Sequence, residues 1–182
     1  MTSSVPLPPW AVETVELVPY DPGWPERAAA FGREVTSALA PWLLRPVEHI
    51  GSTAIPGILA KPVIDLMAET ESKREAAAGA GPALGRLGWE PVPPEADERP
   101  WRLLFVRVSG DGRHRLAHLH LMSAGTPRWA EQLRFRDALR ESTRLRDDYA
   151  RLKTGLAREF AGDREGYSRA KAGFVSQVIS GL

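Results

Sequence analysis

The stretch HIGSTAIPGILAKPVIDLM, residues 49–67, holds two apolar runs that are joined by a Gly-Ser pair and a Pro-Gly turn. The runs at residues 45–50 and 61–69 have the length and the apolar content of strands. Because side chains alternate across a strand, Asp65 falls on the face opposite to the apolar Ile64 and Leu66. The stretch therefore predicts two strands around a tight turn, with one carboxylate inside a buried strand.

Further elements are expected on both sides of this stretch. Apolar residues at helical spacing lie between Pro25 and Pro41, and residues 72–88 form a second expected helix. Gly-Asp-Gly at residues 110–112 separates two apolar runs and predicts a β-hairpin. After Thr126 the pattern is helical, in about three helices. The order predicts a mixed α/β (α+β) fold, in which helices cover a small sheet and a helical C-terminal part follows.

The 182 residues suit a single domain at residues 13–182, with a sheet core at 13–125 and a helical tail at 126–182. Residues 1–12 are rich in proline and are expected to form a flexible arm. The absence of cysteine excludes disulfides and cysteine-ligated metal sites. The chain has no apolar run of about 18 residues and no signal-like N-terminus, so we expect a cytoplasmic protein without a membrane partner.

Charge is unevenly distributed along the chain. Residues 1–112 carry 10 basic and 15 acidic side chains, whereas residues 113–182 carry 14 basic and 8 acidic ones. Two interpretations are open: solvated helix faces of opposite sign, or a basic C-terminal half that binds an anion. The basic residues are too dispersed for a nucleic-acid patch, so a nucleic-acid partner is not expected.

The Gly51-Ser52 pair and its neighbours form a candidate phosphate site. Backbone N–H groups of a Gly-Ser turn can hold a phosphate, with help from the Thr53 hydroxyl and the Lys61 ammonium. The alternative is a tight turn that Ser52 caps. Asp65 is more informative, because a carboxylate in a buried strand needs a metal ion or another partner. A metal ligand and a strand-end aspartate paired with arginine both remain open.

His118 and His120 stand two apart in the expected strand and therefore point to the same face. Together with Asp65 they would form a two-histidine, one-carboxylate metal site, which His49 could join. Such a set suits zinc, manganese or iron, and it would act on a small anionic substrate. The alternative is a pair of core histidines.

The helical tail carries basic and aromatic residues at helical spacing. They could line a pocket for an anion, or form surface ion pairs with tyrosines packed on lysine stems. These residues are Arg136 and Arg140, Tyr149 and Lys153, and Tyr167 and Lys171.

Five segments together resemble one known family: VELVPYDPGWPERAAAF, VEHIGSTAIPGILAKPVIDLM, HLHLM, LRFRDALR, and YARLKTGLA with YSRAKAGFV. The chain resembles the GrpB (UPF0157-type) family of the nucleotidyltransferase-like superfamily over nearly all of residues 15–176. The resemblance implies a small mixed sheet with helices, with Gly51 and Ser52 contacting phosphates. It also implies that Asp65 is a ligand of magnesium or manganese.

The sequence departs from the superfamily pattern at Met67, which stands where the second carboxylate of a metal-binding pair is expected. A third carboxylate is expected on a later strand, where the chain has His118 and His120. Glu69 shares the face of Asp65 and could compensate only partly. Three hypotheses follow: a nucleotidyltransferase-like transferase, an enzyme with one transition metal, or a non-catalytic nucleotide-binding module. The substrate and the oligomeric state stay open.

Overall fold

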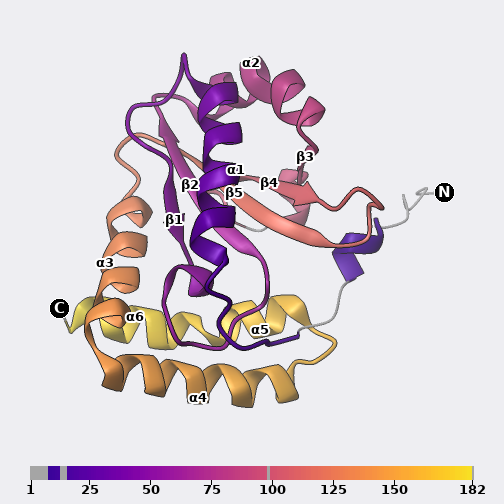
Figure 1. The fold of residues 1–182 in the computed structure, drawn as a ribbon. Coiled ribbons are helices and arrows are strands. Elements are labelled where there is room, and N and C mark those ends of the chain that lie inside the picture. Colours follow the sequence, from indigo (N-terminus) through magenta and orange to yellow (C-terminus); the bar gives the residue numbers. More distant parts are fainter. Residues whose placement is uncertain (1–7, 13–15, 98, 182) are drawn as a thin grey trace.

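The computed structural model describes residues 8–12, 16–97 and 99–181 (Figure 1). Most of the expected flexible arm, residues 1–7, lies outside these ranges, as do residues 13–15. In the described part Pro9–Val12 forms a short 3-10 helix, η1, and Trp10 is buried against Val106 and Val108. In the described residues 16–20, Val18 forms a β-bridge with Ala60.

The described residues form a five-stranded mixed sheet, which confirms the predicted fold class. The strand order is β1-β2-β5-β4-β3. The two central strands, β2 and β5, run parallel, and the other neighbours are antiparallel, including the predicted hairpin of β4 and β5. The strands are β1 (Glu48–Ile50), β2 (Ile64–Thr70), β3 (Trp89–Pro91), β4 (Arg102–Val108) and β5 (Arg115–Ser123).

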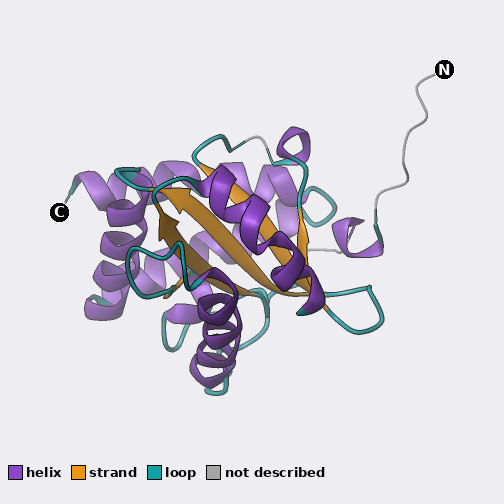
Figure 2. Ribbon diagram, turned by 90° about the horizontal axis from the view of Figure 1, so that it is seen from above, coloured by secondary structure: helices purple, strands orange, loops and turns teal. Residues whose placement is uncertain are grey.

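One face of the sheet packs on α1 (Trp24–Leu39) and α2 (Lys73–Arg86), and Figure 2 shows the sheet between helices. The main core lies on this face, where Ile64 and Leu66 of β2 meet Leu119 of β5 and the apolar sides of both helices. Ser72 caps α2, because its hydroxyl accepts the N–H of Glu75. Asp65, His118 and His120 therefore belong to the other face of the sheet.

The C-terminal part consists of α3 (Arg128–Glu141), α4 (Thr143–Glu159), α5 (Arg164–Ala170) and α6 (Ala172–Ser180). The expectation of about three helices was wrong, because the last one is divided at Lys171. The side chains of Ser142 and Asp163 cap α4 and α5. Figure 1 shows α4, α5 and α6 together across one end of the sheet.

The tail has an apolar cluster of its own. Phe135, Leu139 and Tyr149 pack around Ile55 and Ile58, which lie in the loop between β1 and β2. This packing fixes the helices against residues 51–61, the segment that carries the Gly-Ser turn and Lys61.

Candidate functional site

A cavity of about 1150 Å³ lies between the free face of the sheet and the helical tail. Its walls include ten of the residues that the sequence nominated, together with groups from β4 and α6. The nominated residues are Gly51, Ser52, Lys61, Asp65, His118, His120, Tyr149, Lys153, Tyr167 and Lys171. Residues from both halves of the chain therefore meet in one space.

Gly51 cannot be exchanged for another residue without strain. Its φ of 71° and ψ of −170° lie in a region that only glycine adopts readily. A Cβ atom at this position would stand 2.4 Å from Oδ2 of Asp65. The Gly-Ser turn thus lies directly against the carboxylate of β2, and Ser52 lies within hydrogen-bonding reach of Tyr149.

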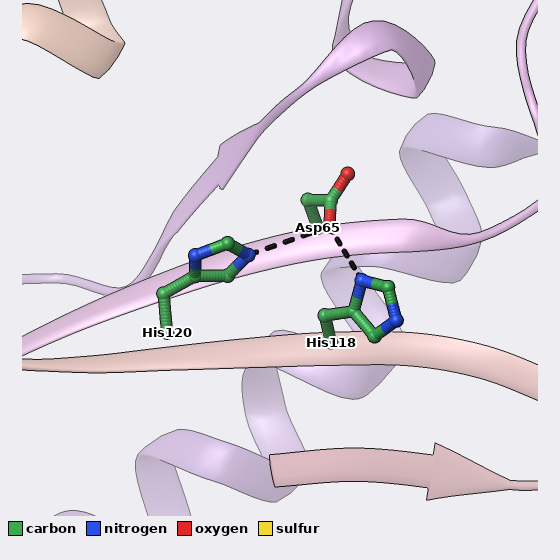
Figure 3. Close-up of side chains that lie close together, drawn as sticks. All are labelled: Asp65, His118 and His120. Carbon is green, nitrogen blue, oxygen red and sulfur yellow. Dashed lines mark hydrogen bonds and ion pairs between the residues drawn. The ribbon is translucent and has the colours of Figure 1, made fainter. Parts of the chain in front are cut away.

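Asp65 contacts both histidines of β5 through one oxygen (Figure 3). Oδ1 of Asp65 is 2.9 Å from Nδ1 of His118 and 3.4 Å from Nε2 of His120. The parallel pairing of β2 and β5 produces this contact, because Asp65 stands beside His118 in the register. Burial opposes ionisation, but the hydrogen bonds from the two imidazoles outweigh it and hold the pKa of Asp65 well below its usual range.

His120 also contacts Arg102, a residue that the sequence analysis missed. Nη1 of Arg102 lies 2.6 Å from Nδ1 of His120, and Asp97 holds the guanidinium through both of its oxygens. Burial and the charge of Arg102 lower the pKa of His120, so its imidazole is neutral near pH 7. One signal was available in the sequence, since Arg102 interrupts the apolar face that it shares with Leu104 and Val106 of the same strand.

Three of the chain's four lysines line the cavity. Lys61 from the β1–β2 loop and Lys171 lie 5.0 and 4.3 Å from the Tyr167 ring centre. Lys153 lies 4.8 Å from the Tyr149 ring centre, and its ammonium donates to the carbonyl of Leu59. The lysines therefore form one cluster, on the side of the tail, around two of the three tyrosines.

Lys153 is the most deeply placed member of this cluster, with 1% of its surface exposed. Burial and the nearby charge of Lys171 lower the pKa of Lys153 to about 7. Burial likewise raises the pKa of Tyr149 to about 12, so this phenol stays protonated. Among the described residues, no carboxylate pairs with Lys153, and its charged form is costly in the ligand-free protein.

Four nominated residues do not line the cavity: His49, Thr53, Arg136 and Arg140. Arg136 donates to Glu48 and to the carbonyl of His49, and it also pairs with Asp137. Arg140 donates to the carbonyl of Ala54. These arginines join α3 to residues on both sides of the Gly-Ser turn, a contact that helical spacing alone could not distinguish from ligand binding.

His49 and Thr53 contact each other behind the turn. Nε2 of His49 lies 3.0 Å from Oγ1 of Thr53, which itself lies 3.5 Å from the carbonyl of Val63. Burial is the main cause that lowers the pKa of His49 to about 4, so its imidazole is neutral. His49 does not belong to the cluster of ligand atoms around Asp65.

The side chains around Asp65 do not fit a two-magnesium centre. Met67 is fully buried among Ile50, Met122 and Trp129, and Glu69 is buried beside Arg45, at 2.7 Å from its Nε. One ion fits better, because the ligand atoms of Asp65, His118 and His120 all lie within 4.8 Å of one another.

Among the described helices, none is long and apolar enough to cross a bilayer.

Comparisons with known proteins agree with this architecture. The family model described as GrpB protein matches residues 14–180. A UPF0157 protein of Pseudomonas aeruginosa is 35% identical over 172 residues, which cover 92% of this chain and 67% of that protein. A dephospho-CoA kinase of Mycobacterium tuberculosis is 31% identical over 174 residues, but the match covers 42% of that longer protein and 85% of this chain.

Two solved structures are similar to this chain. Conserved protein GrpB from Enterococcus faecalis superposes with a TM-score of 0.78 at 25% identity, over 91% of this chain and 96% of that chain. The Cid1 poly(U) polymerase bound to MgGTP superposes with a TM-score of 0.53 at 14% identity, over 78% of this chain and 44% of that chain. The second likeness shows the fold alone. The chain thus belongs to the GrpB family, and its fold is nucleotidyltransferase-like.

Proposed function

We propose that the protein binds a nucleotide, or another phosphorylated small molecule, in the cavity between the sheet and the helical tail. The Gly51-Ser52 turn and the lysines at 61, 153 and 171 hold the phosphates. Asp65 holds one divalent ion beside them, which neutralises phosphate charge when it is bound.

The observation that carries this proposal is the lysine cluster opposite Asp65. Lysine is a common phosphate ligand, and three lysine side chains around one cavity make its wall favourable for an anion. Lys153 shows this most clearly, because it is buried among Tyr149, the carbonyl of Leu59 and the positive charge of Lys171. A phosphate beside Lys153 would favour the charged form of its side chain.

The fold supports the nucleotide as the phosphorylated group, since the Cid1 polymerase of the same fold is described with bound MgGTP. In a transferase, an acceptor hydroxyl would attack the α-phosphorus, so that its P–O bond forms while the α–β bond breaks and pyrophosphate leaves. The acceptor proton would pass to a neighbouring base. His118 is the candidate, because its imidazole lies against Asp65 and lines the cavity.

Isothermal titration calorimetry tests this proposal. We expect the folded protein to bind at least one of ATP, GTP, CTP, UTP or dephospho-CoA in the presence of Mg²⁺ or Mn²⁺. Dephospho-CoA belongs in the set because of the name of the mycobacterial relative. Lys153→Met or Lys171→Met should weaken binding by about tenfold or more. Lys73→Met is the matched control, because it removes the fourth lysine, which does not line the cavity. Absence of binding to all five ligands would refute the proposal.

A second candidate function is that of an enzyme with one transition-metal ion held by Asp65, His118 and His120. The close spacing of the three ligand atoms favours it, whereas the contact of Arg102 with His120 counts against it. Elemental analysis of protein purified without added metal decides the matter. Retention of metal in His118→Ala and His120→Ala variants would exclude this site.

A third candidate is a binding module without catalysis, which the buried Met67 in place of a carboxylate favours. It requires nucleotide affinity that does not depend on metal and that survives Asp65→Asn.

A further inference from the structure

His120 stands between a cation and a carboxylate. Nδ1 of His120 is the ring nitrogen nearer to Nη1 of Arg102, at 2.6 Å against 3.3 Å for Nε2. Arginine can only donate hydrogen bonds, so Nδ1 accepts and carries no proton. A neutral imidazole has a single N–H group, which must then be at Nε2, the atom that faces Oδ1 of Asp65 at 3.4 Å.

Arg102 is itself held firmly in place. Its Nε and Nη2 donate to the two oxygens of Asp97 at 2.8 and 2.5 Å. The side chains of Arg102 and Asp97 are 8% and 5% exposed, so the pair is buried. Trp101 stacks on the His120 ring, with 5.9 Å between the ring centres. The orientation of His120 is therefore fixed from two sides.

This arrangement conflicts with a role of His120 in metal binding. An imidazole that binds a metal through one nitrogen normally donates the N–H of the other nitrogen to an acceptor, and Arg102 offers none. The strand register adds a second observation, because His120 stands beside Met67, the position of the missing carboxylate. In place of a second ligand and a second ion, this part of the centre holds a fixed guanidinium.

We propose that the Asp97–Arg102 pair holds His120 as an Nε2–H donor toward Asp65, so that His120 is not a metal ligand and Arg102 supplies the second positive charge of the centre. Asp97 and Arg102 are positioning residues, because they act through His120. The role in charge balance rests on the proposed function, and it limits the centre to one divalent ion at Asp65. The hydrogen-bonding state of His120 can be tested without any nucleotide.

Side-chain ¹⁵N NMR of the unmodified protein is the first test. We expect the Nε2 of His120 to be protonated and its Nδ1 unprotonated at pH 8. His114, which is exposed between β4 and β5, gives a separate signal in the same spectrum. His120→Gln and His114→Gln assign the signals. A proton on Nδ1 of His120 would overturn the proposal.

Titration with Co²⁺ alone, followed by its visible absorption, is the second test. In the wild-type background His120→Gln should change the Co²⁺ affinity by less than about threefold, because His120 is not a ligand. The double variant Asp97→Asn/Arg102→Met frees Nδ1 and should bind Co²⁺ about tenfold more tightly or better. This gain should vanish when His120→Gln is added, and Arg102→Lys, which keeps a donor, should behave like wild type. A loss of tenfold or more on His120→Gln in the wild-type background would refute the proposal.

If the double variant does not fold, the NMR experiment on the unmodified protein still decides. Neither test uses a nucleotide, so a failure of nucleotide binding would refute the proposed function and leave the result for His120 unchanged.

Discussion

Replacing Lys153 by methionine should stabilise the protein near neutral pH. Lys153 is 1% exposed, and burial lowers its pKa from 10.5 to about 7. In the unfolded chain Lys153 keeps a pKa near 10.5, so it is protonated at pH values where it is largely neutral in the folded protein. The free energy of unfolding therefore falls as pH drops from 10.5 to 7. At about 1.36 kcal/mol per pKa unit, the penalty is about 4 kcal/mol at pH 7 and about 1 kcal/mol at pH 10.

Methionine has a similar shape without the charge, so Lys153→Met removes this penalty. It also leaves the carbonyl of Leu59 without the ammonium donor, at a cost of about 1–3 kcal/mol. We therefore expect the variant to be about 2 kcal/mol more stable than wild type at pH 7 and about 1 kcal/mol less stable at pH 10. The lost hydrogen bond affects both values alike, so the difference of about 3 kcal/mol between the two pH values is the firmer quantity.

Urea denaturation of both proteins between pH 7 and 10 measures this difference, and groups that titrate in both proteins cancel. Lys73→Met is the control: its ammonium, partly exposed on α2, donates to the carbonyl of Pro100, so the variant should lose about 1 kcal/mol and its stability difference should change far less with pH than that of Lys153→Met. A stability difference for Lys153→Met that is independent of pH would refute the reasoning. So would a difference that grows in favour of methionine as pH rises.

Three further predictions concern the turn and its support. Gly51→Ala should lower the free energy of unfolding by about 3 kcal/mol or more, since its Cβ would meet Asp65, whereas Gly57→Ala, with φ of 82° but open space around it, should cost about 1 kcal/mol; equal losses in urea denaturation would contradict this. Arg136→Met should cost about 1–3 kcal/mol through the lost bonds to Glu48 and His49. It should leave nucleotide affinity within about threefold by calorimetry, and a tenfold loss in a folded variant would show instead that Arg136 binds the ligand. The pKa of His49 is about 4 in the folded protein against an ordinary 6.5. Neutral His49 therefore makes its full contribution to the free energy of unfolding above pH 6.5, and this contribution should be lost as pH drops toward 4. His49→Gln should flatten this acid limb in urea denaturation, and an unchanged pH profile would exclude His49 as its cause.

Local patterns accounted for much of the fold. The alternation in residues 61–69 placed Asp65 on the face opposite to Ile64 and Leu66, and the glycines at 110 and 112 located the hairpin of β4 and β5. Alternation and turn chemistry depend on neighbouring residues, so they can be recognised without knowledge of the tertiary structure. The division of the last helix at Lys171 carried no such local signal.

The candidate site was predictable only in part, for a related reason. Helical spacing made Arg136 and Arg140 candidates for the anion pocket, just as it did Lys153 and Lys171. Spacing defines one face of a helix but not the element that this face contacts. In the structure α3 meets the backbone of residues 49–54, whereas α4 and the α5–α6 junction meet the cavity. The contact of Arg102 with His120 depends on the pairing of β4 with β5 and on Asp97 in a loop. Neither Arg102 nor Asp97 was therefore nominated from the sequence.

The central claim is that the lysine cluster binds the phosphates of a nucleotide, and proton uptake on binding tests it most directly. At pH 8 Lys153 is mostly neutral in the free protein, and a phosphate beside it should restore its charge. Calorimetric titration with the Mg²⁺ nucleotide in two buffers of different ionisation enthalpy should therefore show uptake of up to about one proton per nucleotide, and Lys153→Met should abolish this uptake. Absence of binding, or binding by the wild-type protein without proton uptake, would contradict the account.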